Sequence, residues 1–562
     1  MSEEKEMKRL SRREFVKGAA IGAAGVAATG VLASCGATPT PETVIVKETV
    51  EVPKEVIKEV IKEVEVKPWL PKKWDYEYDI VVIGGGGAGA ATAIAATDLG
   101  AKVLILEKAP ERYQGGNTSV AGGELWSHQD VPSAIAYLTA LNGEYVLDPE
   151  HVKTWAANMA DIGNYMRNEL DCKGLLGLEV TWRPWEEFPE LPGVKDSGCW
   201  IVGPKGTDSG YGKHVWDLYK ANIDKRKIEM WFESPAKHLI QDAMTKEILG
   251  VIAEKQGTTV YIKAKKAVVM TCGGFQNNKL MYQDYLKQIN GYGKGTPYNT
   301  GDGIKMALEV NADLWHMASE AGPALEFVAP EIGGFALGTS PGSRQHCIHV
   351  GADGTRFVNE AEGTRHGKVM RHGQWQSYPT PLPIHSIFDD TAFKAAARGA
   401  TERATSGMGW NRIKGVYQWS ADNSVELAKG WIKKADTIRE LAAKIGKDPD
   451  KLEATVTRWN EFCAAGEDKD FGRAKDFLLA LDTPPFYAME LFTTRYNTQG
   501  GPRRNAKNEI LDPSGKPIPR LYGGGELGSP YAHQYNGGMN LGDSLAGGRV
   551  AAAEAVALAP WS

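Results

Sequence analysis

The stretch that decides the fold is YDIVVIGGGGAGAATAIAATDLGAKVLILEKAP, from Tyr78 to Pro110. Its apolar runs predict two strands, at 80–83 and 102–106, because short apolar runs bounded by turn signals are typical of buried strands. The alanine-rich run between them predicts a helix from about 88 to 99, and a run of glycines joins the first strand to that helix. A strand, a glycine turn, a helix and a second strand in this order indicate a βαβ unit of a parallel sheet.

The glycine turn and the end of the second strand predict a dinucleotide site. Gly84, Gly86 and Gly89 have the G-x-G-x-x-G spacing, in which glycines permit a tight turn and let amides at the helix N-terminus meet a pyrophosphate. Glu107 ends the second strand, where a carboxylate accepts hydrogen bonds from a ribose. Together these features predict dinucleotide binding, and Gly87 and Ala88 belong to the same contact surface.

A second glycine-rich loop favours FAD over NAD. The loop is QGGNTSVAGGE, residues 114–124. Its small and polar residues can contact phosphate and ribityl oxygens along a longer cofactor. The residues expected to do so are Gly116, Asn117, Thr118, Ser119, Gly122 and Gly123.

Further blocks follow in order along the chain: AVVMTCGGFQNN at 267–278, YNTGDGIKMAL at 298–308, VGADGTRFVNEAEGTR at 350–365, LYGGGELGS at 521–529 and YNGGMNLGDSLAGGRVAAAEA at 535–555. With these blocks the sequence resembles the FAD-dependent superfamily of fumarate reductases, urocanate reductases and 3-ketosteroid dehydrogenases. The resemblance implies an α/β fold with a Rossmann-like FAD-binding domain of the GR2 type, a parallel sheet plus a β-meander. It also implies an inserted α+β capping domain.

The resemblance assigns roles to matching residues. Asp302 and Glu526 would hold the ribityl and ring region of FAD. Residues 537–541, with Asn540 and Leu541, would start a helix whose positive end faces the flavin. No histidine occupies the loop where succinate dehydrogenases attach FAD covalently, so non-covalent FAD is expected. Taken alone, Asp302 could instead be a turn or helix-capping residue.

The domain organisation follows from these blocks and from shifts in composition. A hairpin is expected over 250–267, and two helical patterns flank the turn Lys-Asp-Pro-Asp at 447–450. The predicted order is an export signal at 1–35, a flexible tether at 36–73, the first part of the FAD-binding domain at 74–311, a capping and substrate domain at 312–481, and the second part of the FAD-binding domain at 482–562.

The N-terminus resembles a twin-arginine export signal. Arg12 and Arg13 precede a weakly apolar run that is too short and too rich in alanine and glycine for a membrane span. Leu32 to Cys35 resembles a lipobox, which predicts a lipid on Cys35 and anchoring at the outer face of the bacterial cytoplasmic membrane, in the periplasm or at the cell surface. A non-lipidated signal is the alternative. The K-E-V-I repeat after it is expected to be a solvated spacer, or a short self-associating helix along Val56, Ile57, Val60, Ile61 and Val64.

Composition excludes some partners. The 562 residues carry a net charge of −5, which does not favour nucleic acid. The six cysteines form no C-x-x-C, so neither an iron–sulfur cluster nor attached c-type haem is encoded, and a membrane quinone or a separate cytochrome is the expected electron partner. A disulfide between Cys172 and Cys199 is conceivable in an oxidising compartment, although spacing alone cannot establish the pairing.

The stretch SPYAHQYNGG, residues 529–538, carries the substrate prediction. Dicarboxylate reductases of the superfamily grip carboxylates with a histidine and an arginine; Tyr535 stands at the arginine position, and Tyr496 and Asn497 stand where the histidine is expected. The serine, proline and tyrosine spacing is similar to that of 3-ketosteroid dehydrogenases, whose tyrosine binds a carbonyl. A phenol is neutral near pH 7 and can donate a hydrogen bond to a ketone oxygen, so Tyr535 is predicted to polarise a carbonyl. The alternative is a core tyrosine packed on the flavin ring.

The proton donor is less well marked. In fumarate reductases an arginine shortly after R-F-V-N-E acts as the acid, and Arg365 follows that motif one position later than the pattern. A structural Arg365 is the alternative, and the reserve candidates are His366, His533, Tyr496 and Tyr531.

Three hypotheses follow. The first is an exported, lipid-anchored FAD oxidoreductase that acts on a carbon–carbon bond next to the carbonyl of a neutral small molecule, as an enone reductase or a ketone dehydrogenase. The second is a fumarate- or urocanate-type reductase whose acid clamp is rebuilt from Arg344, Arg365 or Arg495. The third is an electron-transfer flavin lipoprotein with no substrate of its own.

Overall fold

A computed structural model describes residues 42–50, 58–66, 70–207, 211–289, 291–329, 335–337, 346–362, 364–395, 410, 417 and 419–561. The chain divides into two compact units, Met1–Pro68 and Trp69–Ser562. The export signal, Cys35 and Arg344 lie outside the described residues. None of the helices in the described part is long and apolar enough to cross a membrane.

The first unit contains a two-stranded antiparallel sheet. Strand β1 (Glu42–Val50) pairs with β2 (Lys58–Val66), with Glu42 opposite Val66. The helix considered for the K-E-V-I repeat is therefore wrong within β2, because Val60, Ile61 and Val64 lie in a strand. The solvated spacer contains a paired hairpin at these positions. Charged and β-branched residues alternate along it, and β-branched side chains fit a pleated surface better than a helix. Its role as a tether stays a prediction.

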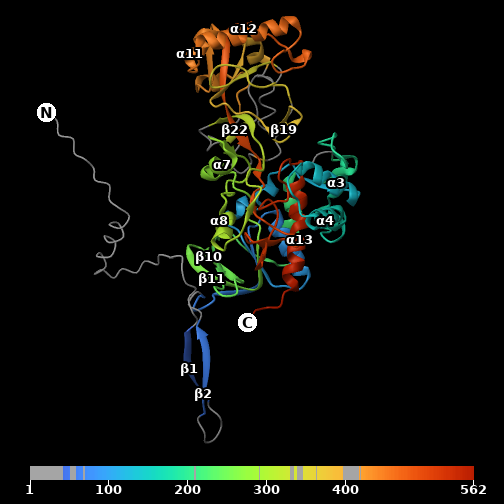
Figure 1. Cartoon of the computed structure of the whole chain (residues 1–562), viewed down its shortest axis with the longest axis vertical. Coiled ribbons are helices and arrows are strands. Elements are labelled where there is room, and N and C mark those ends of the chain that lie inside the picture. The colour runs from blue at the N-terminus through green and yellow to red at the C-terminus, as the bar shows by residue number, and fades with distance from the viewer. Residues whose placement is uncertain are drawn as a thin grey trace, which may run out of the picture. The chain divides into compact units, whose positions relative to one another are not determined.

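The core of the second unit is an eight-stranded sheet around the βαβ unit (Figure 1). Strand β3 (Tyr76–Ile83), helix α2 (Gly87–Asp98) and strand β4 (Val103–Leu106) confirm the predicted elements. Strand β3 lies parallel to β4 on one side and to β11 (Thr258–Met270) on the other. The remaining strands are β8 (Glu229–Trp231), β9 (Ala236–Gln241), β10 (Ile248–Lys255), β25 (Glu509–Leu511) and β26 (Pro517–Gly523).

The meander and the C-terminal helix complete this layer. Strands β10 and β11 form the expected hairpin, and β9 adds to it antiparallel. Helix α13 (Met539–Ala557) packs against α2, and alanines and glycines on both helices bring them close together. Because both helices begin at glycine-rich turns on the same side of the sheet, their N-termini open onto one cavity.

Residues 124–225 add a small sheet and several helices to the second unit. A three-stranded sheet contains β5 (Glu124–His128), β6 (Glu179–Pro184) and β7 (Ser197–Gly203). It is covered by α3 (Val131–Asn142) and α4 (Pro149–Asn168), while α6 (Gly212–Lys225) returns to the main sheet. Cys172 and Cys199 are both buried and free, so the disulfide considered above is not formed.

A second, seven-stranded sheet forms the cap. Its strands are β12 (Gly291–Gly293), β15 (Ala324–Ala329), β16 (Phe335–Leu337), β17 (Ile348–Val350), β20 (Ile384–Phe388), β21 (Ile432–Ala435) and β22 (Phe486–Arg495). Strand β22 pairs with four of these strands, so the sheet crosses the boundary expected at residue 481. Helices α11 (Ile438–Lys444) and α12 (Pro449–Ala465) confirm the two helical patterns and lie at the far end of the cap (Figure 1).

Candidate active site

A cavity of about 710 Å³ runs from the glycine turn after β3 to the segment before α13. Both glycine-rich loops line it, as do residues of the cap strand β15 and of the short strand β23 (Asn497–Thr498) that follows β22. The predicted cofactor residues in its wall are Gly84, Gly86, Gly87, Ala88, Glu107, Gly116, Asn117, Thr118, Gly122, Asp302, Glu526, Asn540 and Leu541. The remaining three, Gly89, Ser119 and Gly123, lie behind this wall.

The turn at one end of the cavity can be formed only by glycine. Gly84 has φ +105°, and a Cβ there would lie 2.5 Å from the Thr271 carbonyl oxygen. A Cβ on Gly89 would lie 2.0 Å from the Gly84 carbonyl oxygen. Both positions therefore exclude a side chain, and the backbone at the start of α2 stays open to a ligand.

Glu107 is held by the backbone around it. Its carboxylate accepts hydrogen bonds from the amides of Gly85, at 2.8 Å, and Ala109, at 2.7 Å. Burial raises the pKa of Glu107, while these two amides act in the opposite direction. The carboxylate is thus fixed at the end of β4, where the sequence predicted a ribose acceptor.

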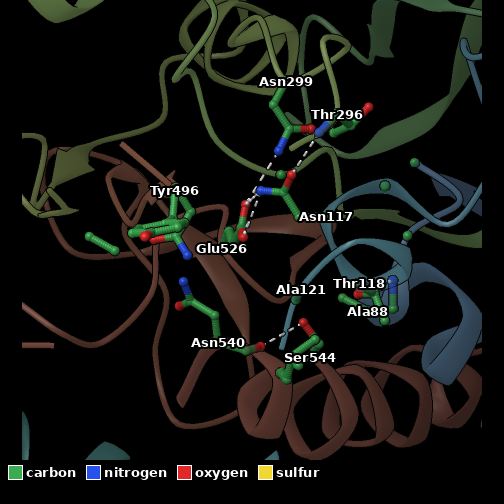
Figure 2. Close-up of a pocket in the computed structure, with 18 of the residues that line it drawn as sticks. Ala88, Asn117, Thr118, Ala121, Thr296, Asn299, Tyr496, Glu526, Asn540 and Ser544 are labelled. Carbon is green, nitrogen blue, oxygen red and sulfur yellow. Dashed lines mark hydrogen bonds between the residues drawn. The ribbon is translucent and has the colours of Figure 1, made fainter. Parts of the chain in front are cut away.

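Glu526 lies at the centre of the cavity among amide side chains (Figure 2). Asn117 Nδ2 donates to both carboxylate oxygens, at 3.1 and 3.2 Å, and Asn299 Nδ2 donates to one of them at 3.4 Å. Asn117 Oδ1 accepts from the Thr296 amide, which sets the orientation of the Asn117 side chain. Burial raises the pKa of Glu526 to about 7, although Asn117 opposes the shift.

Two further polar side chains, Asp302 and Asn540, line the cavity between the glycine turn and the substrate end. Asp302 pairs with Lys108 Nζ and also accepts from Thr300 Oγ1, at 3.0 Å. Asn540, in the first turn of α13, has an Oδ1 that accepts from Ser529 Oγ, but its Nδ2 is buried and has no hydrogen-bond partner among the described residues. A buried donor without a partner costs free energy, which a bound acceptor would recover.

These features fit FAD. The glycine turn leaves backbone amides open for a pyrophosphate, Glu107 suits a ribose, and Asn540 Nδ2 offers a donor to a flavin oxygen or nitrogen. Gly538, with φ +84°, caps α13, so the positive end of the helix points into the cavity.

The substrate end of the cavity is aromatic. Tyr535 and Tyr496 line it together with Trp185 and Trp410, and the Trp410 and Tyr496 ring centroids are 5.3 Å apart. Burial, and then the charge of Glu526, raise the pKa of Tyr535, so the phenol stays protonated at physiological pH. Tyr496 packs under Lys294 Nζ, 4.2 Å from its ring centroid, and Lys294 donates to Glu326 Oε1 at 2.6 Å.

Several candidate catalytic residues do not reach the cavity. Arg365 pairs with Glu190 and lies over the rings of Phe188 and Trp375, outside the cavity wall. His533 stacks on Tyr145, and the Tyr531 hydroxyl donates to the Met539 carbonyl oxygen. As an acid donor, Arg365 therefore lacks access to the cavity, and its placement fits the structural alternative.

No acid clamp is formed by the described residues of the cavity wall. Its lysine and arginine side chains are Lys108, paired with Asp302, and Arg183, 3.8 Å from Glu124. Arg495 is fully buried behind the wall, where it donates to Glu320 at 2.8 Å and to Gln288. Six carboxylates line the same wall: Glu107, Glu124, Glu187, Asp302, Glu326 and Glu526.

Sequence reasoning missed the contribution of the 124–247 segment. Arg183 lies in β6, Trp185 and Glu187 lie in the loop after it, and all three form part of the cavity wall. The only signal in the sequence was the dense cluster TWRPWEE at 181–187, which has no spacing that names a role.

The fold and the cavity define a flavoprotein oxidoreductase. The family described as FAD binding domain matches residues 79–542, and the chain belongs to it. FAD is therefore its cofactor, as predicted, and the Rossmann-like FAD fold with a cap is confirmed.

Relatives support the same class. The chain is 28% identical to a digoxin reductase of Eggerthella lenta, with 98% of each chain covered. It is 26% identical to a 3-oxosteroid 1-dehydrogenase of Mycobacterium tuberculosis, over 85% of this chain and 98% of that one. The crystal structure of a 3-ketosteroid Δ1-dehydrogenase from Sterolibacterium denitrificans, in complex with 1,4-androstadiene-3,17-dione, has a TM-score of 0.65 at 21% identity, covering 86% and 99% of the two chains, and shares the fold.

Proposed function

We propose that this FAD-dependent oxidoreductase moves a hydride to or from a carbon–carbon bond next to the carbonyl of a neutral compound. The observation that carries the proposal is a buried, protonated phenol, Tyr535, in a cavity wall whose described cations are already paired with carboxylates. A dicarboxylate would enter a wall that carries six acidic side chains and whose described lysine and arginine each already lie beside a carboxylate.

When bound, FAD supplies the hydride acceptor or donor. The chain's own residues hold it through the turn at Gly84, Glu107, Asp302 and the start of α13. Tyr535 donates a hydrogen bond to the substrate carbonyl oxygen and stabilises the negative charge that develops there. The aromatic walls around Tyr535 exclude water, which strengthens this hydrogen bond.

Two of the relatives support this reading, while a fumarate reductase of Shewanella frigidimarina is also 26% identical over 85% of this chain, so the choice against an acid reductase rests on the cavity wall. One relative is named for the reduction of digoxin and another for the dehydrogenation of 3-oxosteroids, and both are matched along at least 85% of this chain. The direction of the reaction in this protein follows from its electron partner, for which a membrane quinone or a separate cytochrome is proposed.

Tyr535→Phe tests the proposal. It should retain FAD and lose turnover by about 10²-fold or more, which is the usual effect of removing one oxyanion donor. Tyr531→Phe is the matched control because that neighbouring hydroxyl is buried but does not line the cavity. If Tyr535→Phe and the wild type have equal turnover, Tyr535 does not polarise the substrate carbonyl.

A reoxidation assay tests the substrate class. The dithionite-reduced protein is mixed with neutral enones, fumarate or quinones while the flavin absorbance is followed. Enones should reoxidise the flavin much faster than fumarate does. Faster reoxidation by fumarate would contradict a neutral substrate.

We also propose export and lipid anchoring through Cys35 at the outer face of the cytoplasmic membrane. The support is the paired Arg12 and Arg13 and the Leu32–Cys35 lipobox. Cys35→Ala should move the protein from the membrane to the soluble fraction and abolish labelling with a palmitate analogue. Unchanged fractionation would contradict the anchor.

A further inference from the structure

His366 and Glu187 form a pair in the substrate end of the cavity. Both residues line the wall, and His366 Nε2 lies 2.8 Å from Glu187 Oε1. The atoms meet as charge partners rather than with hydrogen-bond geometry. Neither ring nitrogen of His366 makes a hydrogen bond among the described residues, so a charged imidazole in this wall keeps an N–H for a ligand.

The pair adjoins the carbonyl-binding phenol. The rings of His366 and Tyr535 meet edge to face with centroids 4.9 Å apart. Glu187 Oε2 accepts from the Gly537 amide at 2.6 Å, two residues after Tyr535. Glu187 therefore ties the histidine to the same backbone segment that carries the phenol.

The backbone holds His366 in an unfavourable conformation. Its φ is +47°, in the left-handed region that non-glycine residues rarely adopt. Its carbonyl oxygen accepts from the Gly322 amide at 3.0 Å, and a Cβ on the adjacent Gly367 would lie 1.9 Å from the Gly322 carbonyl carbon. Strain of this kind persists where the surrounding structure fixes a functional side chain.

The charges around His366 favour its protonated form. Burial lowers the pKa of His366, but the Glu187 carboxylate overcomes this effect and raises the pKa above its usual value. The nearby cations are turned elsewhere: Arg365 to Glu190, Arg183 toward Glu124, and Lys368 Nζ to Ser377 Oγ. Glu526, the other acid near Tyr535, lies across the phenol in the flavin region.

We infer that His366 is the proton donor of the reduction and that Glu187 is its positioning residue, an inference that rests on the proposed function. The substrate C=C gains a hydride at the carbon remote from the carbonyl, and the reduced flavin provides it. The π electrons move toward the carbonyl oxygen, where Tyr535 donates its hydrogen bond. The imidazolium N–H bond breaks, a C–H bond forms at the carbon next to the carbonyl, and neutral His366 remains beside Glu187.

Rates of flavin reoxidation test the donor. The dithionite-reduced holoenzyme is mixed with cyclohex-2-enone, 4-androstene-3,17-dione or digoxin between pH 5 and 9. For the enone that reacts, His366→Asn should be slower by about 10²-fold or more. Asparagine tolerates a positive φ, so FAD content and melting temperature should be retained. His533→Asn, outside the cavity wall, is the control and should react like wild type.

The pH profile separates proton donation from a structural role. Because imidazolium is the active form, the wild-type rate should fall as pH rises through the raised pKa of His366. Glu187→Gln should move this falling limb to lower pH by about one unit or more. A limb that stays in place in Glu187→Gln, or His366→Asn within threefold of wild type, overturns the inference.

Nitrogen-15 NMR of the histidine side chains provides a readout that needs no turnover. In the oxidised holoenzyme, one titrating signal should be absent in His366→Asn and should titrate at lower pH in Glu187→Gln. A neutral His366 at pH 6 would overturn the inference whatever the rates show. If the wild type reacts with none of the enones, the proposed function itself fails; if it reacts and His366→Asn reacts equally, only the donor assignment fails.

Discussion

The two ends of the cavity are built in different ways. At the nucleotide end, the Gly84 turn, Glu107 and the 114–124 loop come from one stretch of about forty residues. At the substrate end, the wall is assembled from the loop after β6, the cap strands, the segment around His366 and the segment before α13. The geometry of the nucleotide end therefore depends mainly on local backbone conformation. The substrate end forms only after segments that are distant in sequence have packed together.

The charged side chains at the two ends also differ in how close in sequence their partners lie. Glu107 accepts hydrogen bonds from two backbone amides of its own βαβ unit, those of Ala109 and of Gly85 in the glycine turn. His366 relies on Glu187, and Lys294 relies on Glu326, which lie far from them in sequence. Damage to the nucleotide end should thus remove the cofactor, while damage to the substrate end should spare the cofactor and change the chemistry or the stability of the cap.

Gly84→Ala should have the largest effect, because it breaks the backbone-built end. The new Cβ would sit 2.5 Å from the Thr271 carbonyl oxygen at φ +105°, so the turn must shift and FAD affinity should fall by about 10²-fold or more. Flavin absorbance per protein measures this. Gly100→Ala is the matched control: its φ is +86°, but nothing lies within 4 Å, so it should keep FAD. Full FAD content in Gly84→Ala would contradict the claim that the backbone of this turn determines FAD binding.

Arg495 and Arg365, the candidate acid clamps of the second hypothesis, should differ in their effect on stability. Arg495→Met leaves the buried Glu320 unpaired and should destabilise the fold by about 3–5 kcal/mol. Arg365→Met removes a partly exposed pair with Glu190 and should cost about 1 kcal/mol or less. Chemical denaturation measures both. If the two variants lose similar free energies of unfolding, Arg365 does more than form a surface ion pair. Loss of enone turnover in Arg365→Met would lead to the same conclusion.

Glu526→Gln should have an effect that depends on pH, and it tests the junction between the two ends. The folded pKa of about 7 exceeds the ordinary value of 4.5, so the folded protein keeps a proton that the unfolded chain releases. Stability of the FAD-free protein is therefore lost as pH rises from about 4.5 to 7. Glu526→Gln should match wild type at pH 4.5 and exceed its melting temperature by on the order of 2 °C above pH 7. A difference that does not change with pH would contradict the raised pKa.

The sequence predicted the fold well because its decisive signals are local. The strands and the α2 helix were readable from apolar runs and glycine spacing, and the helix after Gly538 was implied by the family resemblance. The helical alternative for the K-E-V-I repeat is wrong within β2 because the repeat suits a period of two as well as a helical stripe, and strand pairing decides between them. The boundary of the cap was misplaced because β22 joins a sheet whose other strands lie up to two hundred residues earlier.

By itself the sequence determined the dinucleotide site, because glycines that exclude side chains and an acid after a strand act through local backbone geometry; FAD and the reaction class followed from the resemblance of its ordered blocks to a known superfamily. Only the tertiary structure decided which side chains face the substrate. It turned Arg365, His533 and Arg495 away from the cavity and brought Glu187 to His366 from a segment with no readable motif. The physical reason is that a polar side chain takes its role from the partner that folding places beside it, and the order of residues along the chain does not name that partner.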